Sequence, residues 1–211
     1  MPNTQGQKGF QSVTSLVSFL SPIKIKILST NMVKSKYKVS NFMSYLIYAV
    51  AIITSGAYLG NLINMGMVHA TFWLTLDPVQ FMNDFAGKFD LLVTTLPVTR
   101  LPSLIAIIIA IWITRKTLSA RNYWLGALLP AIIGLGISAY YFLPMNNGFI
   151  EQSFTPEEAR TKLEFWYSLH WVRVMLSVVS CLFTFLAFRE TVKAAKPFSS
   201  CLLYTSDAAD E

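Results

Sequence analysis

The sequence has few charged residues and very few cysteines and histidines. Asp, Glu, Lys and Arg make up 13% of the 211 residues, whereas a soluble globular domain carries about 25%. Two cysteines provide no disulfide framework and no CxxC redox motif. The sequence also contains no phosphate-binding glycine loop, no serine-hydrolase elbow, no HExxH motif and no zinc-ligand spacing. These absences argue against an enzyme of the soluble type.

Apolar residues dominate instead and form long runs. They make up 54% of the chain, and the mean hydropathy is +0.48. Four runs are candidates to cross a bilayer, which takes about 20 mostly apolar residues each; they cover approximately 42–65, 91–114, 123–143 and 165–188. None of them ends at the small-residue cleavage site of a secretory signal peptide. We therefore predict an all-α fold, a four-helix transmembrane bundle.

The charged residues lie between these runs, and their sign alternates from one connection to the next. Because positive residues mark the cytoplasmic side of a membrane, we predict that both termini are cytoplasmic. The pI near 9.3 then reflects this topology and contact with anionic lipid of the bilayer, and we expect no nucleic-acid partner. We expect an integral membrane protein of the bacterial inner membrane, because the chain is compact. The basic connections carry Lys8, Lys24, Lys26, Lys34, Lys36, Lys38, Arg115, Lys116, Arg121, Arg189, Lys193 and Lys196, and the acidic ones carry Asp77, Asp84, Asp90, Glu151, Glu157, Glu158 and Glu164.

Both ends of the chain differ from the membrane domain, which we place at 42–190. Residues 1–41 form a basic N-terminal arm, and Met32, followed directly by VKSKYKVSNF, is an alternative start that would make the preceding residues non-native. Residues 191–200 form a basic cytoplasmic tail. The final CLLYTSDAADE, residues 201–211, resembles a translated sequencing adapter, so we exclude it from reasoning about the fold.

Several polar residues follow or end the first run. His69 and Trp73 are one helical turn apart, and Asp77 continues the same face if the helix persists. Asp77 and Pro78 also fit the N-cap and first position of a new short helix. Asn61 and Asn64 share a face of the first run. They could bond another helix or face a ligand, and His69 could be an interfacial histidine or part of a pocket.

The second run encloses an arginine between two prolines. Pro97 and Pro102 free backbone carbonyls that neighbours or water must satisfy. Arg100, between them, could snorkel toward the surface or pair with an acid. Alternatively, Arg100 could contact an anion or an oxyanion inside a cavity.

The last acidic connection carries the strongest local signals. Pro144, Asn146, Asn147 and Gly148 are typical of a turn that ends the third run. Thr155, Pro156 and Glu158 predict a helix start with a capping box. The helix that begins there should continue into the fourth run, where a single stripe at i, i+4 and i+7 is formed by Trp166, His170 and Arg173.

Ionisable groups on one face within a membrane segment indicate a functional site by default. With a rise of about 1.5 Å per residue, His170 lies roughly 8 Å and Arg173 roughly 12 Å beyond Phe165. Both side chains must therefore point into the bundle or into a wet cavity. A purely structural role for the pair is the alternative.

Residues from about 43 to 188 resemble the four-helix membrane family DUF1772, which includes the anthrone oxygenases. The resemblance rests on Gly56 and Gly60, on Asp77–Pro78 and Phe81–Phe85, on the Pro144–Asn146 turn, and on the W-x3-H-x2-R series at Trp166, His170 and Arg173. It covers about 70% of the chain. It implies a four-helix membrane bundle and, for some members, an oxygenase that converts an anthrone to an anthraquinone without an obvious organic cofactor.

The chemistry of such a reaction assigns roles to the polar residues. A base must take a proton from the substrate, and a donor must stabilise the enolate oxygen that develops. Neutral His170 could be the base, and Arg173 or Arg100 could hold the oxyanion. Substrate binding would involve Asn61, Asn64, His69, Trp73, Tyr140, Asn146 and Trp166, with the amides orienting ring oxygens and the aromatic rings stacking on a flat substrate.

Two other classes of function are compatible with the same residues. His69 and His170 could be axial ligands of a haem, although our principal expectation is that there is no cofactor and no metal. A membrane carrier or accessory subunit would bind a small hydrophobic ligand in the same pocket without converting it. Association into a homo-oligomer also stays open.

Overall fold

The computed structural model describes residues 42–195. The predicted N-terminal arm with Met32, the tail from residue 196 onward and the adapter-like segment 201–211 lie outside the described residues. The chain divides into two units, Met1–Tyr45 and Leu46–Glu211, and the bundle belongs to the second. Its described part is helical, with four helices long and apolar enough to cross a membrane. The prediction of an all-α, four-helix membrane bundle is confirmed.

The helices continue beyond the predicted runs at almost every end. The first long helix is Phe42–Thr75, and it includes a π-helical segment, η1 (Met65–Ala70), followed by α2 (Thr71–Thr75). A short bend leads to α3 (Pro78–Ile113). The third span consists of α4 (Leu118–Ile137), the π-helical η2 (Ser138–Phe142) and α5 (Leu143–Ile150), and the fourth is α6 (Pro156–Ala195).

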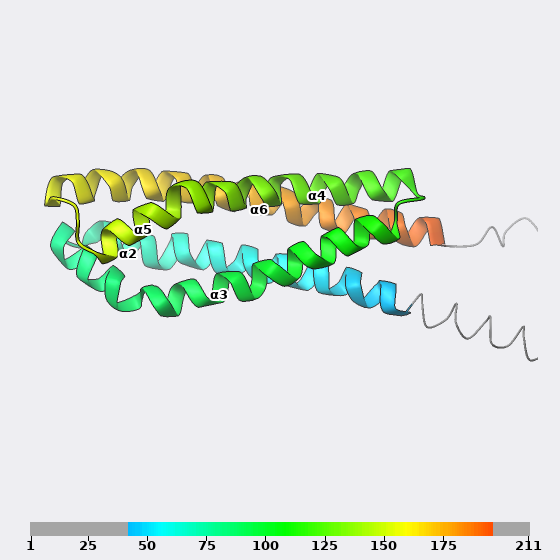
Figure 1. The fold of residues 1–211 in the computed structure, drawn as a ribbon, viewed down its shortest axis with the longest axis horizontal. Coiled ribbons are helices and arrows are strands. Elements are labelled where there is room, and N and C mark those ends of the chain that lie inside the picture. The colour runs from blue at the N-terminus through cyan, green and yellow to red at the C-terminus, as the bar shows by residue number, and fades with distance from the viewer. Residues whose placement is uncertain (1–41, 196–211) are drawn as a thin grey trace, which may run out of the picture. The chain divides into compact units, whose positions relative to one another are not determined.

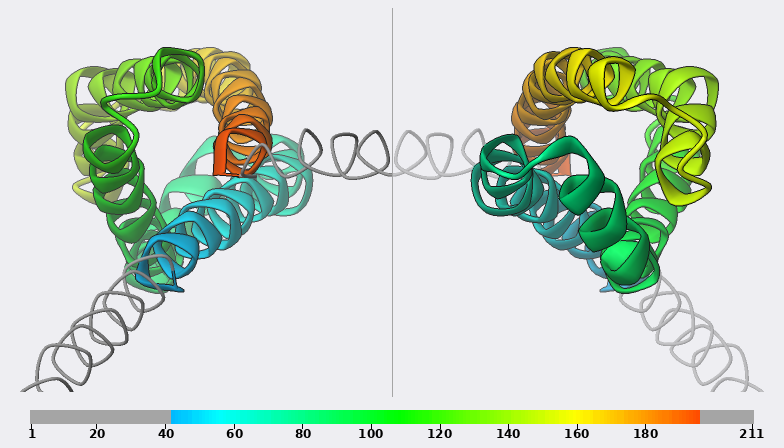
Figure 2. Two further views of the ribbon diagram at one scale, coloured as in Figure 1. Left: turned by 90° about the vertical axis from the view of Figure 1, so that its right-hand side faces the viewer. Right: turned by 90° about the vertical axis from the view of Figure 1, so that its left-hand side faces the viewer.

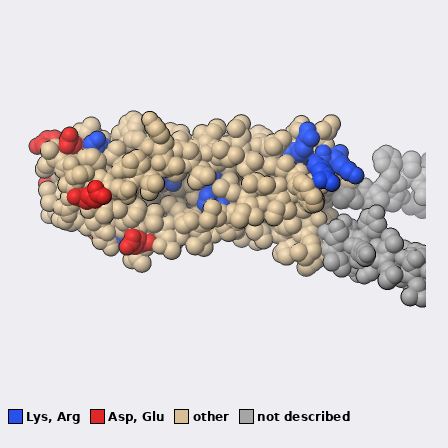
Figure 3. Space-filling view, viewed as in Figure 1, with Lys and Arg blue, Asp and Glu red and all other residues tan. Residues whose placement is uncertain are grey.

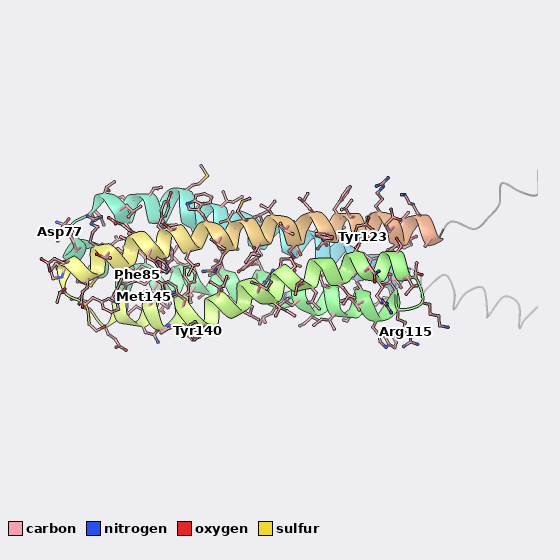
Figure 4. The ribbon with its side chains drawn as sticks, turned by 90° about the horizontal axis from the view of Figure 1, so that it is seen from above. Asp77, Phe85, Arg115, Tyr123, Tyr140 and Met145 are labelled. Carbon is pink, nitrogen blue, oxygen red and sulfur yellow. The ribbon has the colours of Figure 1, made fainter. Side chains whose placement is uncertain are left out.

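The spans run along a common axis, and the charges separate to its two ends. Figure 1 shows α4 and α6 side by side, with α2, the start of α3 and the α5–α6 connection at one end. The end-on views in Figure 2 show the spans arranged around a common centre. Acidic atoms gather at one end and a group of basic atoms at the other, with further basic atoms beside the acidic ones and midway along the bundle (Figure 3), and Figure 4 shows Asp77 and Arg115 at the two ends. We call them the acidic end and the basic end.

Two helix starts have the predicted local chemistry. The Asp77 carboxylate accepts a hydrogen bond of 3.0 Å from the Val79 amide, and Pro78 is the first residue of α3. The Thr155 amide donates to Glu158 Oε2 at 3.0 Å, and the Glu158 amide donates to the Thr155 hydroxyl at 3.4 Å. These reciprocal bonds form the expected capping box.

Two local predictions are wrong. Pro78 opens no separate short helix, because α3 continues for 36 residues through the second span. The turn expected at Pro144–Gly148 is helix α5, which follows the π-helical η2 without a break and has Pro144 as its second residue. The chain reverses later, at Gln152, whose φ is 51°.

A cluster of buried aromatic side chains fills the acidic end of the bundle. Edge-on and tilted contacts with centroid separations of 4.9 to 6.1 Å connect most of its rings. Such contacts stabilise beyond simple area burial. We call this group the aromatic cluster; it comprises Trp73, Phe81, Phe85, Phe142, Phe149 and Trp166.

Candidate functional site

A small cavity lies against the aromatic cluster, and five residues singled out in the sequence line it. Its volume is about 40 Å³, which is room for about two or three water molecules. The rest of the wall is apolar and comes from the first helix and α3. The five predicted residues on the wall are Trp73, Asn146, Trp166, His170 and Arg173.

The backbone of the first helix determines how the His170 ring presents its nitrogens. His170 is 1% exposed, and its Nε2 lies 2.9 Å from the carbonyl oxygen of Leu62. A carbonyl can only accept, so Nε2 carries the proton and donates it. In the neutral ring Nδ1 is therefore unprotonated. Nδ1 is buried and has no hydrogen-bond partner among the described residues, which leaves a buried lone pair on a residue that lines the cavity.

Gly66 makes this approach of His170 to the first helix possible. A Cβ atom at Gly66 would lie 3.1 Å from His170 Cδ2 and 3.2 Å from Nε2, closer than ordinary van der Waals contact. Gly66 lies in η1, and π-helical segments are frequent at functional sites. At Gly56 and Gly60, which the sequence suggested for close helix approach, an added Cβ would meet nothing within 4 Å. The close approach occurs one to two turns further along.

Asn146 and Trp166 hold the other face of the imidazole. Trp166 Nε1 donates a 2.9 Å hydrogen bond to Asn146 Oδ1, and the indole stacks on His170 with centroids 5.2 Å apart and planes 9° apart. The predicted helical stripe on α6 provides Trp166 and His170, and the unexpected helix α5 provides Asn146. The result is a ring clamped between Trp166 and the backbone at Leu62.

Trp73 completes the wall toward the acidic end. Its Nε1 donates to Asp84 Oδ2 at 2.8 Å, and Asp84 pairs with Lys88 at 2.6 Å. Its ring contacts Trp166 edge-on at 6.1 Å. Trp73 is thereby fixed in orientation by a polar group that itself lies outside the cavity.

Arg173 brings a positive charge to the cavity. It is 6% exposed, its guanidinium lies 4.1 Å from the centre of the Phe142 ring, and Nε has no hydrogen-bond partner in the described chain. Arg100 is equally buried but lies outside the cavity wall. Its Nη2 donates to the Ala131 carbonyl at 2.6 Å, and its guanidinium lies 4.5 Å from the Tyr58 ring. Neither snorkelling nor pairing with an acid describes Arg100.

Four of the predicted substrate-binding residues do not reach the cavity. Asn61 donates weakly to α3, at 3.4 Å to Thr99 Oγ1, as expected for an amide that holds two helices together. Asn64 is exposed, and His69 is half-buried with its ring 6.0 Å from Trp73. Tyr140 is 90% exposed, and Figure 4 shows it at the edge of the bundle. The π-helical η2 turns the Tyr140 side chain outward, away from the cavity, and the stacking role expected for it stays a prediction.

Sequence reasoning missed the groups that position the site. These are the Leu62 carbonyl, Gly66 and Phe142. A backbone carbonyl carries no sequence signal. Gly66 gave the one available signal, because it lies between Asn64 and His69 in the first helix. Only the structure shows which ring lies against it.

No family model, no curated protein and no solved structure matches the chain. Residues 42–195 contain no group of three or more His, Cys, Asp and Glu side chains suited to a metal ion. The function must therefore be argued from the cavity itself.

Proposed function

We propose that this protein is an integral membrane oxidoreductase of the anthrone-oxygenase type. It would use O2 to oxidise a small hydrophobic aromatic compound that has an acidic C–H bond. The observation that carries the proposal is the His170 ring, which lines the cavity and whose Nε2 is committed to the Leu62 carbonyl, while its Nδ1 is buried and unpaired among the described residues. A carrier has no need of a base held in one tautomer.

His170 Nδ1 is the base in this scheme. It takes the proton from the substrate carbon, and the imidazolium that forms keeps its bond from Nε2 to Leu62. Stacking on Trp166 holds the ring in one plane, so that the lone pair points in a fixed direction. Positioned general bases contribute roughly 10²- to 10⁴-fold to a reaction rate.

Arg173 stabilises the negative charge that the proton transfer leaves on the substrate. The enolate oxygen of an aromatic ketone is a compact acceptor, and a guanidinium in apolar surroundings is a strong donor to it. Arg173 lines the same cavity as His170. Asn146 lines it too, but its carbonyl oxygen already accepts from Trp166, so its role is to position that indole.

The oxidation balances without an external reductant. The carbanion adds to O2, and the imidazolium returns its proton to the peroxide, which gives a hydroperoxide at the former C–H carbon. The His170 imidazole then takes the second proton from this carbon while the O–O bond breaks, and it passes this proton to the leaving hydroxide, which yields a ketone and water. One O2 is consumed, one oxygen atom enters the product, the other leaves as water, and the imidazole ends neutral.

The size of the cavity sets a condition on the substrate. At about 40 Å³ it holds O2 or water, whereas pockets for ring compounds measure roughly 300–1,000 Å³. A tricyclic substrate therefore has to displace side chains of the wall. Met65, at the start of η1, and Leu96, beside Pro97, are the flexible candidates for this displacement.

Oxygen uptake with a simple anthrone tests the proposal. Membranes that contain the wild-type protein should consume O2 faster than membranes with His170→Ala, by roughly 10² or more. His69→Ala is the matched control, because it removes the other histidine, which does not line the cavity. The product should be the corresponding anthraquinone in a one-to-one ratio with O2.

Equal oxygen uptake in wild-type and His170→Ala membranes would contradict the proposed oxygenase activity. If the wild-type protein then still bound the anthrone, a carrier or accessory subunit would be the remaining function. A Soret band in the purified protein would instead establish haem chemistry. The cytoplasmic location of the basic end belongs to the same proposal and is supported by the distribution of positive residues. The bacterial inner membrane also belongs to it and is supported by the compactness of the chain.

A further inference from the structure

Two arginines are buried in the bundle without a carboxylate partner. Arg100 and Arg173 are each 6% exposed, and a guanidinium does not lose its proton in a protein. The two ion pairs within residues 42–195 are Lys88–Asp84 and Lys193–Glu190. No Asp or Glu is among the buried residues of the described chain. The charge of both arginines is therefore uncompensated by the protein.

The surroundings of the two guanidinium groups satisfy them only in part. Each lies over one aromatic ring, and Arg100 also donates to one backbone carbonyl. The Nε atom of each is buried without a partner. A cation–π contact stabilises an exposed cation by about 0.5–1 kcal/mol and a desolvated one by about 2 or more. The desolvation of a buried ion costs several kcal/mol, so donors remain unused.

The two charges act on the same region. Arg100 of α3 and Arg173 of α6 lie within electrostatic range of each other. Like charges repel strongly in apolar surroundings. The apolar core of the bundle thus holds two positive charges close together. A bound anion would balance them.

The space beside Arg173 fits a compact anion. The cavity that Arg173 lines has a volume of about 40 Å³, which suits a group of about the size of two or three waters. We propose that this cavity is an anion site, in which Arg173 binds a compact monovalent anion directly. Arg100 adds its charge from one helical turn beyond Leu96 of the cavity wall. The anion is either a free halide or the carboxylate of an organic ligand.

Anion binding does not rest on the proposed oxidation, because it requires no base and no O2. The two ideas meet at one point. An anion in the cavity occupies the place of the enolate oxygen and should compete with an oxidisable substrate.

Iodide quenching of tryptophan fluorescence tests the site, since Trp73 and Trp166 line the cavity. The purified protein is kept in an uncharged detergent at constant ionic strength while sodium sulfate is replaced by sodium iodide. A bound iodide gives quenching that saturates, whereas collisional quenching rises linearly. We expect saturation in the wild-type protein.

Three variants assign the site to the arginines. Arg173→Gln should weaken iodide binding at least about tenfold, because it removes a charged hydrogen-bond donor. Arg100→Gln should weaken it about threefold or more, because it removes only the field. Arg115→Gln, at an exposed arginine of the basic end, is the control and should leave the affinity within about twofold.

Competition identifies the source of the anion. Displacement of iodide by 2-naphthoate but not by uncharged 2-acetylnaphthalene identifies an organic carboxylate, and displacement by chloride alone identifies a halide site. Linear quenching of the wild-type protein overturns the proposal, as does an unchanged affinity in both arginine variants. If Arg173→Gln does not fold, the wild-type titrations and Arg173→Lys, which keeps the charge, decide the question.

Discussion

The imidazole of His170 lies flat against the indole of Trp166, with ring centroids 5.2 Å apart and planes inclined by 9°. Trp166 is itself held by a hydrogen bond to Asn146. The three residues come from two helices, so the direction of the His170 ring depends on how α5 packs against α6. Changes at Asn146 should therefore act on His170 at a distance.

Replacing Asn146 with Leu should lower both stability and turnover. The Trp166 indole would lose its acceptor in a buried position, which costs about 1–3 kcal/mol, and the indole would no longer be fixed against His170. Thermal unfolding and oxygen uptake measure the two effects. Asn147→Leu, at the exposed neighbouring amide, is the control. Equal loss in both variants would show that the effect comes from helix α5 as a whole.

Gly66→Ala should displace the His170 ring from the first helix. The added methyl group would lie 3.1 Å from His170 Cδ2, so the bond from Nε2 to Leu62 must lengthen. We expect a fall in turnover of about tenfold or more, since small misplacements of a catalytic group are costly. Gly60→Ala has open space at its Cβ and should be neutral or stabilising by up to about 1 kcal/mol. Full turnover in Gly66→Ala would show that the hydrogen bond from His170 to the Leu62 carbonyl is not needed for the reaction.

Tyr140→Ala should leave ligand affinity unchanged. The side chain is 90% exposed on the apolar surface, and therefore faces lipid in a membrane. Titration of wild-type and variant protein with an anthrone, followed by tryptophan fluorescence, measures the affinity. A loss of more than about twofold would return Tyr140 to the binding site, and would imply that η2 rotates when the ligand enters.

Thr155→Ala should destabilise the protein by about 1 kcal/mol, because the start of α6 loses its N-cap hydroxyl. The effect should appear as a lower melting temperature without a change in ligand affinity. Thr161→Ala, at an exposed threonine that bonds only to the Glu157 carbonyl of its own helix, is the control. Equal melting of the two variants would mean that Glu158 alone caps the helix.

Single cysteines should report the orientation of the bundle. In a background without native cysteines, Gln152→Cys at the acidic end should react with a membrane-impermeant maleimide added to intact cells. Lys116→Cys at the basic end should react only after permeabilisation. The opposite pattern would place both termini outside the cytoplasm.

The parts of the structure that were predictable are those in which the signal is local. The caps at Asp77 and Thr155 depend on residues two or three positions away, and the α6 stripe depends on the helical repeat alone. Both were therefore visible in the sequence. The ends of the spans were less predictable, because charged residues such as Asp84 and Lys88 are typical of a loop between apolar runs. They are the polar surface of a helix that extends past the apolar run.

The arrangement of the site was not predictable, because it depends on contacts between helices. Asn146 was expected in a turn, and its bond to Trp166 exists only because α5 stays helical and brings the amide inside. Tyr140 and Tyr141 are adjacent and chemically alike, yet Tyr140 is exposed while Tyr141 packs against Phe142. The rotation of a helix about its axis decides between them, and nothing in a short motif specifies that angle.

Because of the lengths of α3 and α6, one part of the molecule lies in the hydrocarbon layer and another part lies among headgroups and water. At 1.5 Å per residue, their 36 and 40 residues extend about 54 and 60 Å, whereas the hydrocarbon layer is about 30 Å thick. Phe81 and Phe85 of the aromatic cluster lie on the stretch of α3 that carries Asp84, Lys88 and Asp90, and this stretch is therefore surrounded by headgroups and water. Urea, which does not enter hydrocarbon, should consequently loosen the wall of the cavity while the spans below it remain inserted.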